Sequence, residues 1–152
     1  MDLGIKGKTA LVLASSRGLG QAMAHSLARE GVQVAVTGRN AEGLAQTVKM
    51  IESVGGKALA LNWDLAELNA IDGHVQTIEN QLGPVDILIN NTGGPPPTPA
   101  SGQDPQLWQK SFQEMVLSLM KITDAYRDWE TDRKSTRLNS SHSAKSRMPS
   151  SA

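Results

Sequence analysis

Four short apolar runs alternate with four segments of helical period, and this alternation limits the folds open to the chain. The apolar runs are Lys8–Ala14, Val32–Thr37, Lys57–Leu61 and Val85–Asn90. The helical segments are Gly18–Glu30, Ala41–Val54, Glu67–Leu82 and a helix that starts at Pro105, with Asp104 as its N-cap. Strands separated by single helices require crossovers, which give a parallel sheet covered by helices on both faces. The pattern therefore predicts a doubly wound, Rossmann-type α/β fold.

Each helical segment carries apolar residues at helical spacing, which predicts the face that it buries. These residues are Leu19, Met23 and Leu27 in the first segment, Leu44, Val48 and Ile51 in the second, Leu68, Ile71, Val75, Ile78 and Leu82 in the third, and Trp108, Phe112, Met115, Val116 and Leu119 in the fourth.

Ligands of such sheets bind beyond the carboxyl ends of the strands, and the first strand ends in a glycine-rich loop. The candidate residues there are Ser15, Ser16, Arg17, Gly18, Leu19 and Gly20. Gly18 and Gly20 allow close approach of a ligand, and the positive end of the following helix suits a phosphate. Ser15 and Ser16 are expected to add hydroxyl donors. The alternative is a serine-capped helix after a glycine turn.

The second strand ends in Arg39 rather than in the acid that usually binds ribose hydroxyls at this place. With Arg17 on the neighbouring loop, two guanidinium groups are available to a ribose 2′-phosphate. This predicts NADP(H) rather than NAD(H) as the cofactor. The alternative is a pair of solvated arginines on exposed loops.

Polar residues also follow the third and fourth strands. Asp64 and Leu65 follow the third, where Asp64 is expected to form a capping box with Glu67 and to accept from an adenine amine. Asn91, Thr92 and Gly93 follow the fourth, before a stiff loop rich in proline. We expect all four strand ends to form one binding surface.

Taken together, these motifs resemble those of the short-chain dehydrogenase/reductase family, over about residues 5–124. The family's glycine motif, threonine-glycine-x-x-x-glycine-x-glycine, aligns with Leu13–Gly20, and Asn90–Gly93 resembles its asparagine-asparagine-alanine-glycine motif. Within the family, the sequence resembles bacterial 3-oxoacyl-acyl-carrier-protein reductases. The resemblance implies an NADP(H)-dependent oxidoreductase, a small-molecule carbonyl or alcohol substrate and a homo-oligomeric parent, dimer or tetramer. It also implies that the adenine contact is made by Asp64.

Two departures from the family concern catalysis. Met115 stands where many members have a relay asparagine, seven residues after Trp108. The family's catalytic serine and tyrosine-x-x-x-lysine pair follow a fifth strand, whereas here Tyr126 is followed four residues later by Glu130. We therefore assign no catalytic residue, expect a sheet truncated after the fourth strand and its following helix, and expect the chain to be inactive.

Composition divides the chain into a partial NADP-binding domain, residues 1–124, and a tail, residues 125–152. The first part has 9 Lys/Arg and 12 Asp/Glu, whereas the second has 6 and 3, together with seven serines. The tail is expected to be disordered, because it has no apolar period. It resembles translated sequencing-adapter read-through; a natural basic tail is the alternative.

The formal net charge is zero, which does not favour a nucleic-acid or membrane partner. The chain contains no cysteine, which excludes disulfides. No apolar run reaches the length of a membrane span, and the three histidines show no metal-ligand spacing. A cytoplasmic location is expected. Two other functions remain open: a non-catalytic nucleotide-binding module, and a methyltransferase of similar sheet order, which the missing acid disfavours.

Overall fold

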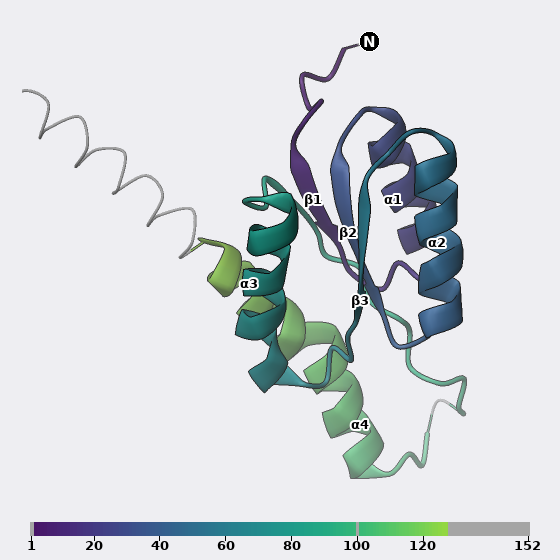
Figure 1. Ribbon diagram of the computed structural model, residues 1–152. Coiled ribbons are helices and arrows are strands. Elements are labelled where there is room, and N and C mark those ends of the chain that lie inside the picture. Colours follow the sequence, from purple (N-terminus) through teal and green to yellow (C-terminus); the bar gives the residue numbers. More distant parts are fainter. Residues whose placement is uncertain (1, 100, 128–152) are drawn as a thin grey trace, which may run out of the picture.

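The computed structural model describes residues 2–99 and 101–127, which form a four-stranded parallel sheet with helices on both faces (Figure 1). The strands are β1 (Thr9–Val12), β2 (Gln33–Gly38), β3 (Ala58–Asn62) and β4 (Ile87–Ile89). The helices are α1 (Gly18–Arg29), α2 (Ala41–Ser53), a 3₁₀ turn η1 (Leu68–Ala70), α3 (Ile71–Leu82), α4 (Pro105–Phe112) and a π-helical stretch η2 (Gln113–Leu117), after which the helix continues to Arg127. The predicted doubly wound α/β class is confirmed.

The strand order β3-β2-β1-β4 places β1 in the interior of the sheet, although it comes first in the chain. Ala10 is in register with Val34 of β2 on one side and with Ile87 of β4 on the other. Among the described residues, no strand pairs with the outer edge of β4. Because all three strand pairings are parallel, the carboxyl ends of the four strands lie at the same edge of the sheet, as the sequence predicted.

Two hydrophobic clusters lie on opposite faces of the sheet, because successive side chains of a strand point to opposite sides. Leu11 and Leu13 belong to the cluster covered by α3 and the helix through Ile122. Ala10 and Val12 belong to the cluster covered by α1 and α2. β1 and β2 are buried on both faces, which explains why these central strands are continuously apolar rather than alternating, whereas β3 and β4 are only partly buried.

Helix α1 buries its small residues rather than its large ones. Gly20, Ala24 and Ala28 are buried, whereas Leu19, which the spacing predicted on the inner face, is 69% exposed. The small residues let α1 lie close to the sheet. The predicted inner faces of α2 and α3 are confirmed, since their predicted residues are buried or pack against the two clusters.

The helix from Pro105 begins as predicted, since Oδ1 of Asp104 accepts a hydrogen bond of 2.9 Å from the backbone N–H of Gln106. Its predicted inner face is only partly buried. Leu119 packs against the core, but Trp108, Phe112 and Val116 are exposed by 65%, 54% and 38%. The first turns of this helix extend beyond the sheet (Figure 1), where no strand of the described chain covers them.

The division predicted between residues 124 and 125 falls inside this last helix. Ala125 and Tyr126 pack against the same cluster as Leu119, and the Tyr126 hydroxyl donates a 3.0 Å hydrogen bond to the carbonyl of Asp86. Residues 128–152, and so most of the predicted tail, lie outside the described residues.

Candidate functional site

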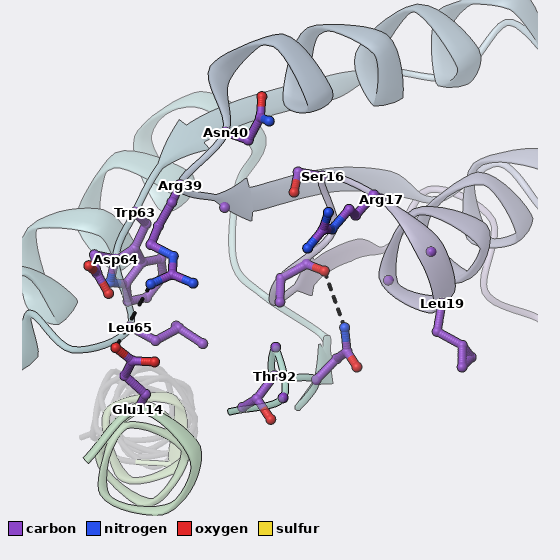
Figure 2. Close-up of a pocket in the computed structure, with 17 residues that line it drawn as sticks. Ser16, Arg17, Leu19, Arg39, Asn40, Trp63, Asp64, Leu65, Thr92 and Glu114 are labelled. Carbon is purple, nitrogen blue, oxygen red and sulfur yellow. Dashed lines mark hydrogen bonds and ion pairs between the residues drawn. The ribbon is translucent and has the colours of Figure 1, made fainter. Parts of the chain in front are cut away.

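A cavity of about 450 Å³ lies at the carboxyl ends of the strands (Figure 2). It is lined by residues from all four strand ends and from one distant helix: Ala14, Ser16, Arg17, Gly18, Leu19, Gly20, Gly38, Arg39, Asn40, Trp63, Asp64, Leu65, Asn91, Thr92, Gly93, Gly94 and Glu114. Eleven of the twelve predicted binding residues thus line one cavity, and Ser15 does not.

The first turn of α1 presents uncapped backbone N–H groups to this cavity. Its N-cap residue, Arg17, makes no side-chain capping bond, and neither does Ala70 before α3, whereas Asn40 caps α2 and Asp104 caps α4. A helix N-terminus carries a partial positive charge and unsatisfied donors. Gly18, at φ +60°, starts the helix, and a Cβ built there meets no atom within 4 Å. The turn is therefore open to an anion.

The predicted phosphate-binding role of the Ser15 hydroxyl is wrong. Ser15 is fully buried, and its Oγ donates to the carbonyl of Val12 at 2.8 Å and accepts from the N–H of Thr37 at 2.9 Å. The hydroxyl thus links the ends of β1 and β2 and holds the loop after β1 in place. Ser16, the next residue, lines the cavity instead.

Asn91 ties the end of β4 to the loop after β1. Its Nδ2 donates to the carbonyls of Leu13 and Ala14, both at 3.2 Å. Ala14 has φ +47° and is the one non-glycine residue of the described chain with a positive φ. The site thus stores backbone strain where the family motif has glycine.

Arg39 is already paired with an acid inside the cavity. Its guanidinium Nη1 lies 3.8 Å from Oε1 of Glu114, and Nζ of Lys110 lies 3.8 Å from the same oxygen. Figure 2 shows Arg39 and Glu114 facing each other, with Arg17 across the cavity. The prediction that the second strand end lacks an acid holds for β2, but a carboxylate reaches the same place from a helix far along the chain.

Asp64 lines the cavity but does not form the predicted capping box with Glu67. Oδ1 of Asp64 accepts from the backbone N–H of Ala66 at 2.9 Å, and the Glu67 side chain makes no capping bond. The reason is that a turn and the 3₁₀ segment η1 precede α3, so Asp64 stabilises the turn rather than the helix.

Trp63 forms part of the cavity wall beside Asp64. Its side chain is 1% exposed, and its indole Nε1 has no hydrogen-bond acceptor among the described residues. The ring stacks on His74, with 4.5 Å between centroids. Burial lowers the pKa of His74, against a smaller opposite effect of Glu67.

Sequence reasoning missed two kinds of lining residue. Ala14, Gly38, Asn40, Trp63 and Gly94 are next to predicted residues in the chain, so those neighbours already indicated their location. Glu114 gave none, because its position depends on how the last helix packs across the strand ends. No group of three or more His, Cys, Asp or Glu side chains suited to a metal occurs within residues 2–99 and 101–127. In the same residues no helix has the length and apolarity needed to cross a membrane.

The sheet order and the cavity at its carboxyl edge place this chain among the Rossmann-type α/β proteins. A family model described as short chain dehydrogenase matches residues 8–150, a range that includes most of the predicted tail. The chain belongs to the short-chain dehydrogenase/reductase family of oxidoreductases.

Known relatives agree with this assignment. The ketoacyl reductase HetN of Nostoc sp. is 40% identical over 89 residues, which are 59% of this chain and 31% of that protein. L-sorbose reductase from Gluconobacter frateurii, solved with NADPH and L-sorbose, superposes with a TM-score of 0.77 at 28% identity, over 83% of this chain and 48% of that one. A short chain dehydrogenase from Burkholderia cenocepacia, solved with NADP, gives 0.77 at 30% identity, over 82% and 51%. The chain spans 31% of the length of HetN and 51% of that of a 2,3-dihydro-2,3-dihydroxybenzoate dehydrogenase from Bacillus subtilis, which is 30% identical over 132 residues.

Proposed function

We propose that this chain is the cofactor-binding part of an NADP(H)-dependent oxidoreductase that interconverts carbonyl and alcohol groups in its intact parent. The observation that carries the proposal is the uncapped N-terminus of α1, which opens with Arg17 and Arg39 onto one cavity. Backbone donors at a helix N-terminus suit a pyrophosphate, and guanidinium groups suit a 2′-phosphate. The complexes of two relatives with NADPH and NADP support the same cofactor.

The residues present fit this cofactor at each strand end. Gly93 and Gly94 have no atom within 4 Å of a built Cβ, so a flat ring can approach the backbone there. Asp64 retains an acceptor oxygen that does not bond to the turn. When bound, the nicotinamide supplies or accepts the hydride. The residues of this chain bind and orient the nucleotide.

The described residues offer no group placed to move the proton that carbonyl reduction requires. Tyr126 donates to the carbonyl of Asp86, which precedes β4 and so lies at the opposite end of the strands from the cavity. Tyrosine serves as a proton donor only near a cation that lowers its pKa. The chain as given is therefore proposed to bind NADP(H) and to be inactive, while the intact parent is a cytoplasmic homo-oligomer.

The test is a titration of the 152-residue chain with NADPH and with NADH. Tryptophan fluorescence reports binding, because Trp63 lines the cavity. A charge-assisted contact to the extra phosphate contributes about 1.5–3 kcal/mol, so NADPH should bind roughly ten- to hundredfold more tightly. Equal affinity for the two would contradict the cofactor choice. Reproducible NADPH oxidation with a panel of ketones, abolished in Tyr126→Phe, would contradict the proposed inactivity.

A non-catalytic nucleotide-binding module is the second candidate, favoured by Met115 at the relay position. The genomic sequence beyond the codon for Asp124 distinguishes the enzyme from the non-catalytic module. A serine followed by tyrosine-x-x-x-lysine supports the enzyme, and their absence supports the module.

A further inference from the structure

Glu114 introduces a negative charge into a cavity proposed to hold an anion. It comes from η2 and is 23% exposed, so it is partly shielded from solvent. Its Oε1 lies within ion-pair distance of both Arg39 and Lys110, at 3.8 Å, but accepts no hydrogen bond among the described residues. Two cations therefore balance this carboxylate without a close, directional contact.

The pair with Arg39 is loose enough to be exchanged for another anion. Side chains of Arg39 and Lys110 are 63% and 64% exposed, so both can rearrange in solvent. Guanidinium binds best when two of its N–H groups meet two oxygens, and the contact to Glu114 is longer than a hydrogen bond. A phosphate that offers three oxygens is a better partner for Arg39 than this carboxylate is.

The carboxylate nevertheless opposes such a phosphate in two ways. Arg39 must give up its pairing with Glu114, and a dianionic group beside Arg39 is repelled by the remaining carboxylate. A ribose 2′-hydroxyl meets neither penalty, because it carries no charge. The carboxylate of Glu114 is therefore expected to weaken binding of a 2′-phosphate more than binding of a 2′-hydroxyl.

We propose that Glu114 is a selectivity-determining residue, which pairs with Arg39 and weakens binding of a 2′-phosphorylated nucleotide relative to one with a free 2′-hydroxyl. This inference rests on the proposed function, because it takes the cavity to be a nucleotide site. It assigns the degree of preference for NADP(H) to an acid outside the glycine-rich loop and the second strand end.

The test compares 2′,5′-ADP with 5′-AMP, two fragments that differ at the 2′-position, by calorimetric titration of the full chain. Glu114→Gln is expected to tighten 2′,5′-ADP about three- to tenfold and to change 5′-AMP less than about twofold. Glu52→Gln is the matched control, since it removes the same charge from the exposed end of α2, away from the cavity. It should change neither affinity.

A double-mutant cycle with Arg39→Gln guards against a trivial effect on folding. In the Arg39→Gln background, Glu114→Gln should change 2′,5′-ADP binding clearly less than in the parent. Nucleotide binding with an unchanged 2′,5′-ADP to 5′-AMP ratio in Glu114→Gln overturns the role of Glu114 alone. If the parent and every variant fail to bind either fragment, the proposed nucleotide site itself is wrong, and the role of Glu114 falls with it.

Discussion

For Gly20→Ala, helix propensity and tertiary packing predict changes of opposite sign in the free energy of unfolding. Gly20 is the third residue of α1, where alanine is favoured over glycine by about 1 kcal/mol. A Cβ at Gly20, however, would collide with the carbonyl oxygen of Ala14 and stand 2.8 Å from Nδ2 of Asn91 and 2.9 Å from Cα of Ser15. Two of these three neighbours are backbone atoms, which cannot rotate away.

The cost of this collision exceeds the gain in propensity. Overpacking a rigid site costs about 1–3 kcal/mol, and displacing Asn91 weakens its two hydrogen bonds to the loop, each contributing about 1 kcal/mol. After the propensity gain is subtracted, we expect Gly20→Ala to lower the free energy of unfolding by about 2 kcal/mol.

Gly73→Ala is the matched control. Gly73 is also the third residue of its helix, α3, but a Cβ there meets no atom within 4 Å. The control should therefore raise the free energy of unfolding by up to about 1 kcal/mol. Urea unfolding followed by far-UV circular dichroism measures both changes. A Gly20→Ala protein as stable as the Gly73→Ala protein would refute the packing described for the loop after β1.

Three further changes follow from the same region. Ala14→Gly should raise the free energy of unfolding by about 0.5–1 kcal/mol, because glycine relieves the φ of +47° at some cost in chain entropy; a lower denaturation midpoint would contradict this. Asn91→Ala should lose about 1–2 kcal/mol as two loop carbonyls lose their donor, which calorimetric melting against a Thr92→Ala control measures. The pKa of His74 is lowered in the folded protein, so the unfolded chain binds the proton more tightly and the free energy of unfolding falls as the pH drops below the usual value of 6.5. His74→Gln should flatten this pH dependence below 6.5, and an unchanged slope would show that another group causes it.

The sequence predicted the fold well because the central strands β1 and β2 are buried on both faces. Continuous apolar strands and one-sided helices are then the only pattern that fits, and the strand ends must meet at one edge. The direction in which a small polar side chain points is a different matter. Ser15 and Ser16 are identical and adjacent, yet one hydroxyl is buried between β1 and β2 while the other faces the cavity. Nothing local to the sequence separates them.

Long-range placement accounts for the remaining differences. Glu114 reaches Arg39 only because the helix after Pro105 crosses the strand ends, which depends on contacts between residues far apart in the chain. Leu19 was predicted to be inside from its spacing, but the close approach of Gly20 to the loop turns it outward. The helical period of apolar residues predicts that a helix has a buried face, but packing determines how the helix is rotated about its axis and so which residues that face contains.

The interior position of β1 has a consequence for synthesis. The hydrogen bond from Asn91 to Ala14 joins residues 77 positions apart, so one side of β1 stays unpaired until β4 has been made. At about 5–20 residues per second, the ribosome needs several seconds to supply the missing strand. During that time the loop that begins the cavity lacks its support from β4. A ligand of the finished cavity therefore binds best to chains in which β4 has docked, and it favours completion of this part of the fold by mass action.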